Sequence, residues 1–230
     1  PNAAALGLDL TRTQTLVLSH GHWDHTGGIA WLRRQAPHLE VFAHPGVVQP
    51  RYSIRGGSAR AIPMPGEAMA ALDALEPARV HWVQAPLELA PGVGLTGPIP
   101  RETDFEDPGG PFYLDPEGRR PDPIEDDLAL WIRTEKGLVV CVGCAHAGLV
   151  NTLRQVGRLH PGEGVRAVMG GLHLGAASPR RLDRTVAALA EMGLERVVPC
   201  HCTGDAATAR LQEAMGDRVT PGAAGMRLTF

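Results

Sequence analysis

Residues 19–28, SHGHWDHTGG, place three histidines and one aspartate within six consecutive positions, from His20 to His25. The run TLVL at 15–18 comes directly before them, and its leucine and β-branched residues are typical of a short strand. Ordinary packing gives no reason to gather so many imidazoles where a strand gives way to a loop. The chain must therefore fold so that this edge of a sheet carries chemistry.

The spacing within this segment indicates a metal site. His20 and His22 point to the same side of an extended segment, because side chains alternate along it, so they can bind one ion. Glycine at 21, 27 and 28 lets the backbone bend, so that Asp24 and His25 can face a second ion. Zinc accepts imidazole nitrogen and carboxylate oxygen at about 2.0–2.2 Å, and a catalytic site leaves one position open for water.

The remaining pattern is that of an α/β domain. The sequence predicts strands at 40–45, 80–83, 87–95, 128–143 (two strands, joined at 135–137), 165–171 and 195–200. Between them it predicts helices at 27–37, 67–75, 149–156 and 178–193, with Thr26 and Ser178-Pro179 as helix-start signals. Strands alternating with helices are typical of layered α/β folds. Residues 97–127, rich in Pro, Gly and acids, form a long loop, and loops of this length are usually functional or disordered.

Three more histidines follow predicted strands: His146, His173 and His201. In layered α/β proteins, sites are built at this edge of the sheet. The four cysteines are too few for a disulfide scaffold, and their C-x-x-C and C-x-C spacings allow a structural zinc site. Cys141, inside GLVVCVG, is expected to pack as a small hydrophobic residue instead.

Composition limits the partners. The chain has 230 residues, 43% hydrophobic and 20% charged, which suits one globular domain over residues 1–230. The net charge of −3 gives no reason to expect nucleic acid. No apolar run approaches the ~20 residues that span a bilayer, and no signal peptide is visible, so we expect no membrane and a cytoplasmic location. A small-molecule substrate is the expected partner, and the oligomeric state is not predicted.

With these histidines, the sequence resembles the metallo-β-lactamase superfamily, whose signature is an H-x-H-x-D-H loop after a strand. LTGPIPRETDFE, GLVVCVGCAHAGLVNTL, VMGGLHL and VPCHCTG resemble the branch related to the dihydropterin–aminobenzene ribose-phosphate synthase, and the resemblance covers nearly the whole chain. It implies an αββα sandwich. The strands that open that fold are mostly missing before His20, so an N-terminally truncated sequence is expected.

The resemblance also implies a ligand set. His20, His22 and His146 would bind the first metal, and Asp24, His25 and His201 the second; zinc, as one or two ions, is the expected metal. Most members have a bridging Asp at the end of the strand that corresponds to 138–143, where this chain has Gly143-Cys144. The thiolate of Cys144 could replace that bridge, or the two ions could lack a bridge. In an alternative register, GGLHL is the substitute and His173 enters the ligand set. All three possibilities stay open.

The chemistry expected of such a site is hydrolysis by activated water, with Asp24 orienting the nucleophile and His173 as general acid or substrate hydrogen-bond donor. Arg101, which could fork onto a phosphate, and the backbone N–H groups of Ala147-Gly148 at a helix start suggest a phosphorylated substrate. The main alternative is a transferase, similar to the pterin synthase, that displaces diphosphate. A diiron redox protein, against which His22 argues by resemblance, and a non-catalytic metal-binding protein are further alternatives.

Overall fold

The structure is a computed structural model that describes residues 2–230, and the chain divides into two compact units. Unit 1 holds the chain up to Gln84 together with Pro111–Asp126, and unit 2 holds Ala85–Gly110 and Asp127–Phe230. The predicted loop at 97–127 is thereby shared between the units, with one short strand inside it. That the two units make up a single domain stays a prediction.

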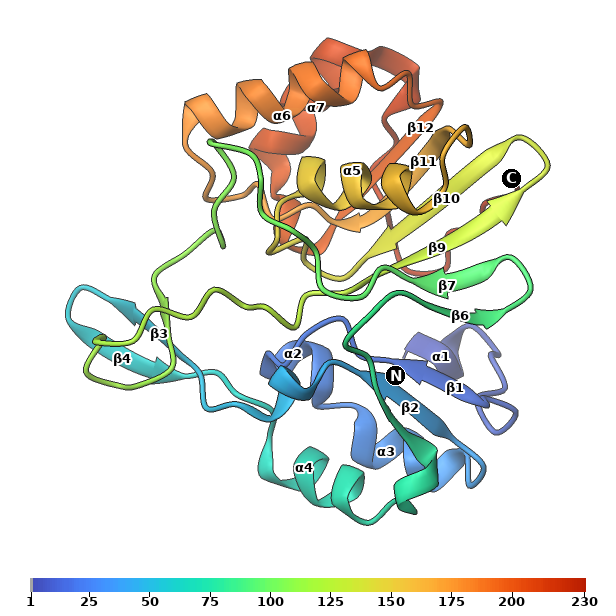
Figure 1. The fold of residues 1–230 in the computed structure, drawn as a ribbon, viewed down its shortest axis with the longest axis vertical. Coiled ribbons are helices and arrows are strands. Elements are labelled where there is room, and N and C mark those ends of the chain that lie inside the picture. Colours follow the sequence, from blue (N-terminus) through green and yellow to red (C-terminus); the bar gives the residue numbers. More distant parts are fainter. Residues whose placement is uncertain (1) are drawn as a thin grey trace. The chain divides into compact units, whose positions relative to one another are not determined.

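Unit 1 carries two small sheets (Figure 1). The first is parallel, with the order β1-β2-β5, and consists of β1 (Thr15–Val17), β2 (Glu40–Ala43) and β5 (Val80–Trp82). The second is antiparallel, with the order β4-β3-β8, and consists of β3 (Tyr52–Arg55), β4 (Ser58–Ala61) and β8 (Phe112–Tyr113). The helices of this unit are α1 (Asn2–Ala5), α2 (Trp23–Thr26), α3 (Ile29–Gln35) and α4 (Gly66–Asp73), with 3-10 turns at Pro45–Val48 and Pro77–Arg79.

The core of unit 1 forms between the parallel sheet and helices α3 and α4. Val41 and Ala43 of β2, Ile29 of α3 and Leu72 of α4 are buried in one cluster. The predicted helix at 27–37 is thus confirmed as α3, but the expected cap is wrong. Gly28 begins α3, whereas Thr26 ends α2 and its hydroxyl donates to the carbonyl oxygen of His22 at 2.9 Å.

Unit 2 is built on a six-stranded sheet with the order β12-β11-β10-β9-β7-β6. Its strands are β6 (Leu87–Ala90), β7 (Val93–Leu95), β9 (Ala129–Thr134), β10 (Gly137–Val142), β11 (Val165–Gly171) and β12 (Arg196–Cys200). Its helices are α5 (Leu149–Leu159), α6 (Pro179–Glu191) and α7 (Asp205–Met215), with 3-10 turns at His201–Thr203 and Gly216–Arg218. Strands β10, β11 and β12 run parallel, and β9 pairs with β10 in the antiparallel sense.

The parallel strands position the site, because α5 links β10 to β11 and α6 links β11 to β12. Each helix returns the chain to the start of the next strand, as a parallel pair requires. The carboxyl ends of all three strands therefore meet at one edge of the sheet, and the segments that follow them begin at 143, 172 and 201. The sequence prediction that histidines follow these strands is confirmed.

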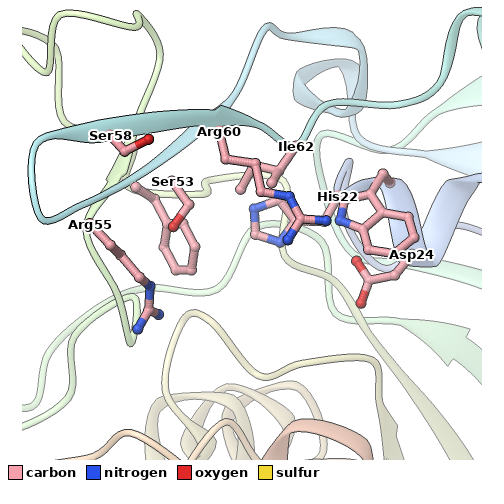
Figure 2. Close-up of a pocket in the computed structure, with 9 residues that line it drawn as sticks. His22, Asp24, Ser53, Arg55, Ser58, Arg60 and Ile62 are labelled. Atoms are coloured by element: carbon pink, nitrogen blue, oxygen red, sulfur yellow. The ribbon is translucent and has the colours of Figure 1, made fainter.

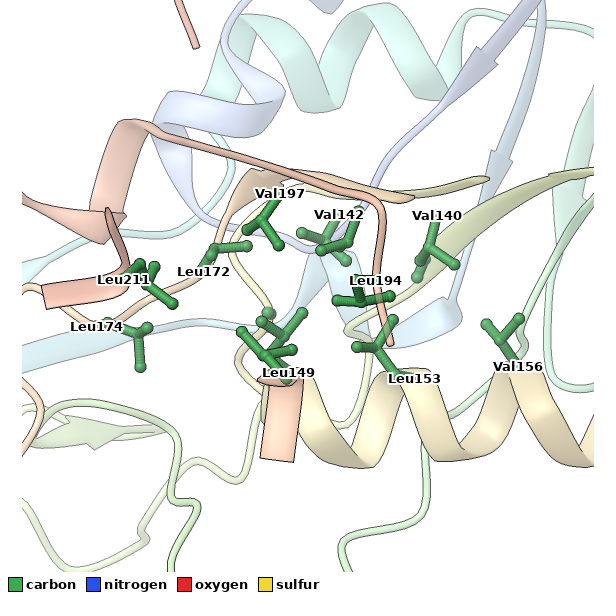
Figure 3. Close-up of a cluster of buried hydrophobic side chains, with 14 of the residues drawn as sticks. Val140, Val142, Leu149, Leu153, Val156, Leu172, Leu174, Leu194, Val197 and Leu211 are labelled. Carbon is green, nitrogen blue, oxygen red and sulfur yellow. The ribbon is translucent and has the colours of Figure 1, made fainter. Parts of the chain in front are cut away.

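Apolar stripes on the helices form the core of unit 2 (Figure 3). Leu149, Leu153 and Val156 of α5 are buried, as their spacing predicts, and they belong to the same cluster as Val140 of β10. The side chain of Ser178 accepts a hydrogen bond from the backbone N–H of residue 181, which confirms it as the cap of α6. Within residues 2–230, no helix is both long and apolar enough to cross a membrane.

Several helices and strands are not predicted from the sequence: helices α1, α2 and α7, strand β8 and the β3–β4 hairpin. The hairpin has a recognisable signal, since Gly56 and Gly57 join its strands with φ of 55° and 77°. A two-residue turn with positive φ at both positions matches the twist of the flanking strands, and Gly-Gly is one of the pairs that form it. The polar residues of the hairpin hide the strand signal, because all four residues of β4 are exposed.

Candidate metal centre

The histidine loop of unit 1 begins three residues after β1 and gathers its imidazoles as predicted. His20 and His22 are buried, and Nε2 of His20 lies 2.9 Å from Nδ1 of His22. The ring centroids of His20 and His25 are 4.3 Å apart, and the hydroxyl of Ser19 lies 3.1 Å from Nδ1 of His20 and 3.5 Å from Nδ1 of His25. Three imidazoles thus share one small volume.

Asp24 and His25 lie on the one-turn helix α2 that follows the loop. The Asp24 carboxylate is 3.5 Å from Nε2 of His25, and its side chain is 35% exposed while that of His25 is 16% exposed. The sequence places both residues after a bend but does not predict the helical turn. The turn brings Asp24 to the surface of unit 1, where it lines a cavity together with His22 (Figure 2).

The backbone of this loop is held by a buried carboxylate that the sequence analysis does not identify. Asp126 accepts a hydrogen bond from the backbone N–H of Gly21 at 2.7 Å. Both of its oxygens also accept from the guanidinium of Arg51, at 2.5 and 2.9 Å, and Arg51 pairs with Asp122 at 3.0 Å. A Cβ at Gly21 would clash with the carbonyl group of Val47, so the loop can approach that backbone only through glycine.

In unit 2, the carboxyl ends of the parallel strands bring together a second set of donors. Sγ of Cys144, after β10, lies 3.3 Å from Sγ of Cys202, after β12. A donor atom of His173, after β11, lies within 4.8 Å of both sulfurs. Cys202 is absent from the ligand set predicted from sequence, although its C-x-C spacing signals it. This grouping places a donor atom of His173 near Cys144, and which of the two would bind a metal stays a prediction.

His146 also lies at this edge of the sheet, and a hydrogen bond at Nδ1 orients its ring. Nδ1 of His146 donates to the carbonyl oxygen of Pro108 at 2.7 Å, since a carbonyl can only accept, and the ring centroid lies 4.1 Å from that of His173. The next backbone N–H, that of Ala147, donates to the buried carboxylate of Asp127 at 2.6 Å. The Nδ1 hydrogen bond to Pro108 orients the ring, and a neutral imidazole with its proton on Nδ1 has its lone pair on Nε2, the form that binds metals.

The strand ends adopt unusual backbone conformations. Ala145, His173 and His201 have φ of 41°, 51° and 52°, and together with Ile124 they are the non-glycine residues at positive φ within residues 2–230. Such conformations are costly for residues with a side chain, and they gather at functional sites. His201 is exposed, in contrast to His146.

The acidic part of the long loop has a structural role, which corrects one prediction. Glu106 accepts hydrogen bonds from the backbone N–H groups of Val150 and Asn151 at 2.8 and 2.9 Å, at the start of α5. The prediction that Ala147-Gly148 offers free N–H groups to a substrate anion is therefore wrong. The protein's own carboxylates, Glu106 and Asp127, occupy that helix start.

Further acids of this loop bind arginines of the helices. Glu102 pairs with Arg158 of α5 at 2.7 Å, and Asp104 pairs with Arg184 of α6 at 2.7 Å. Arg101 is exposed, and one of its Nη atoms donates to the carbonyl oxygen of His146 at 2.7 Å. This contact makes Arg101 a support for the His146 segment, and its predicted contact with a phosphate stays a prediction.

Electrostatics distinguishes the cysteines. The pKa of Cys202 is held well below its usual range, first by its hydrogen-bond contact with the Cys144 side chain and then by the nearby His173 and His201. Burial raises the pKa of Cys141 to about 11. Cys141 is only partly buried, so its expected packing in the core is not confirmed, but its raised pKa makes it a weakly reactive thiol. The lowered pKa of Cys202 suits a soft metal ion.

Replacing the carboxylate that holds the histidine loop should destabilise unit 1. Asp126→Ala leaves the buried Arg51 guanidinium with one carboxylate fewer and leaves the N–H of Gly21 without its acceptor, so the free energy of unfolding should fall by about 3–5 kcal/mol. Urea denaturation measures this. Asp73→Ala, at the exposed end of α4, is the control and should change stability by less than about 0.5 kcal/mol. Equal losses for both variants would contradict the assignment.

The lowered pKa of Cys202 predicts an unusual pH profile for its alkylation. In chain freed of metal by a chelator, Cys202 is already thiolate at about pH 6, so its rate with iodoacetamide should change little up to about pH 8. An ordinary thiol, with a pKa near 8.5, gains about tenfold per pH unit over the lower part of this range. Peptide mass spectrometry at each pH reports the rate, and a tenfold rise per unit at Cys202 would refute the shift.

Comparison with known proteins agrees with the sequence pattern. The family model of the metallo-beta-lactamase superfamily matches residues 2–201. A 7,8-dihydropterin-6-methyl-4-(beta-D-ribofuranosyl)-aminobenzene-5'-phosphate synthase of Methanocaldococcus jannaschii is 30% identical over 216 residues, which cover 88% of this chain and 70% of that protein. An uncharacterized protein of the same organism is 28% identical, over 86% of this chain and 72% of its own length.

Solved structures show the same fold. The crystal structure of a metal-dependent hydrolase of the beta-lactamase superfamily has a TM-score of 0.80 and 28% identity, covering 99% of this chain and 83% of that one. Zn²⁺-bound PqqB from Methylobacterium extorquens has a TM-score of 0.52 and 16% identity, covering 94% and 73%, and shows likeness of fold alone. The predicted α/β class is confirmed, and the chain belongs to the metallo-β-lactamase superfamily of metal-dependent enzymes.

Proposed function

We propose that this chain is a metal-dependent hydrolase that uses one or two zinc ions and acts on a phosphorylated small molecule. The proposed ligands are those predicted from the sequence: His20, His22, Asp24, His25, His146, His201 and Cys144. The observation that carries the proposal is the contact between Nε2 of His20 and Nδ1 of His22, 2.9 Å apart in a buried loop that also holds His25.

The chemistry of the donor set supports a metal. Two neutral imidazoles in this contact share one proton, and a cation would use the lone pairs of both. In unit 2, the hydrogen bond from His146 to the Pro108 carbonyl is the kind of contact that orients metal-binding histidines. The Cys144 and Cys202 sulfurs with His173 add soft donors, which zinc accepts beside imidazole. The residues present therefore fit a zinc site.

The protein's own groups have separate roles in the proposed reaction. A bound divalent cation acts as a Lewis acid, which polarises the bond under attack and favours deprotonation of water. Asp24, whose carboxylate is partly exposed, orients the nucleophile at the wall of the cavity in unit 1. For His173, the hydrogen bond between its Nε2 and the Gly109 carbonyl at 3.3 Å favours a ligand or positioning role over that of general acid.

The second candidate is a transferase, and one observation favours it. The synthase from Methanocaldococcus jannaschii matches this chain at 30% identity over 88% of its length. By analogy, such a reaction displaces diphosphate from a dihydropterin when an aromatic amine attacks. Both reactions need the same metal ligands, so the difference lies in what reaches the reacting carbon or phosphorus: water or an acceptor.

Removing one histidine of the loop should weaken metal binding. His22→Ala should weaken metal binding at least tenfold, by analogy with the ~10–100-fold effect of groups that merely orient ligands. Metal per chain is measured by plasma mass spectrometry after purification without chelator. The matched control is His38→Ala, an exposed histidine of the same unit, which should keep the full metal content. Full metal in His22→Ala would refute the ligand assignment.

One assay distinguishes the two candidate reactions. Zinc-loaded chain is incubated with a dihydropterin methyl diphosphate or with phosphate monoesters, each with and without an aminobenzene ribose-phosphate acceptor, and free phosphate or diphosphate is measured. Release in water alone supports the hydrolase. Release of diphosphate only when the acceptor is present supports the transferase and overturns the hydrolase. No release in any mixture, with metal bound, would favour a non-catalytic metal-binding protein.

A further inference from the structure

One face of the β3–β4 hairpin carries a set of polar residues. The register places Ser53 opposite Arg60 and Arg55 opposite Ser58. Because side chains alternate along each strand, these four residues share one face. Phe112 of β8 pairs with Ser53 on the other side of β3 and joins that face. The face therefore presents two guanidinium groups, two hydroxyl groups and one aromatic ring.

This face lines a cavity of about 400 Å³ within unit 1 (Figure 2). The opposite wall consists of His22, Trp23 and Asp24, at the end of the histidine loop and the start of α2. The ring of Phe112 lies 5.2 Å from that of His22, centroid to centroid. The volume is within the range of small-molecule sites, about 300–1,000 Å³. A molecule in this cavity would contact both the arginines and two of the proposed metal ligands.

The charges of this face call for an anion. Within residues 2–230, no carboxylate forms an ion pair with Arg55 or Arg60, whereas Arg51, Arg158 and Arg184 each pair with a carboxylate. Arg60 is instead held over the ring of Trp23, 5.8 Å from its centroid. Like charges on one face of a sheet repel, so two arginines without carboxylate partners lower the stability of the fold. A ligand with several anionic oxygens would relieve this repulsion.

The donor chemistry selects the class of anion. A guanidinium group presents a fork of N–H donors that matches two oxygens of a phosphate. Two guanidinium groups and the hydroxyls of Ser53 and Ser58 offer more donors than one carboxylate can accept, because a carboxylate has about four lone-pair sites. A phosphate or diphosphate group can accept from all of them.

We propose that this arginine face of the β3–β4 hairpin is the substrate's phosphate-binding site, which holds a phosphate or diphosphate group with the reacting bond beside His22 and Asp24. The inference rests on the proposed function, since it names the substrate class of that site. It assigns to Arg55 and Arg60 the role that the sequence suggests for Arg101, and Trp23 and Phe112 give an aromatic substrate two rings to contact.

Binding of inorganic pyrophosphate tests the proposal without any turnover. Isothermal titration is performed on the full chain, on Arg55→Gln/Arg60→Gln, and on Arg12→Gln/Arg34→Gln. The last variant removes the same charge from two exposed arginines of unit 1 outside the cavity. The cavity variant should bind pyrophosphate at least ~10-fold more weakly, because it loses the charged donors. The control variant should bind within about twofold of the parent chain at the same ionic strength.

Metal content, measured on each sample, keeps the two proposals apart. Weak binding by the cavity variant at unchanged metal content supports the arginine site. Equal affinity in all three chains, equal losses in both variants, or no binding by the parent chain would each overturn it. An affinity that follows metal content instead of the arginines would also overturn it. Failure of the proposed metal site would appear separately, as a chain that holds no zinc yet binds pyrophosphate through Arg55 and Arg60.

Discussion

Two consecutive buried carboxylates, Asp126 in unit 1 and Asp127 in unit 2, hold the backbone beside the histidines of their own unit. Asp126 accepts from the N–H of Gly21, between two histidines of the loop in unit 1. Asp127 accepts from the N–H of Ala147, directly after His146 in unit 2. A buried charge is tolerated only when it is paired or fully hydrogen-bonded, and Arg51 supplies the pairing for Asp126. The stretch that contains both carboxylates is thus a fixed support.

The acidic side chains of the loop before Asp126 also have hydrogen-bond or ion-pair partners. These partners lie within the chain: Glu106 accepts hydrogen bonds at the start of α5, and the exposed Glu102 and Asp104 pair with arginines of α5 and α6. The acidic side chains of this loop therefore have partners in the folded chain that the sequence alone does not reveal. Arg55 and Arg60 lie on the β3–β4 hairpin and line the cavity beside His22 and Asp24, where we propose that they bind an anionic substrate.

The family relationship and the geometry each contribute a different part of the functional conclusion. Membership in the superfamily supplies metal dependence, and the packed imidazoles of His20, His22 and His25 fit it. The fold alone does not decide function, since reactions depend on the site built on it. Sγ of Cys144 contacts Sγ of Cys202 at the strand end where the resemblance implies an aspartate in most members, so a metal bound there would meet softer donors. The proposed arginine face would favour phosphate.

The sequence by itself determined the class of fold and the strand ends that carry His146, His173 and His201, and it predicted a metal site at the His20–His25 loop. These follow from local patterns: alternation, helical periodicity and ligand density are readable within a few residues. Only the tertiary structure decided the partners that lie far apart in the chain. Cys202 meets Cys144 across β10–β12, and Asp126 meets Gly21 and Arg51, because strand order and burial bring them together. Those contacts have no local signal, since they depend on packing between distant segments.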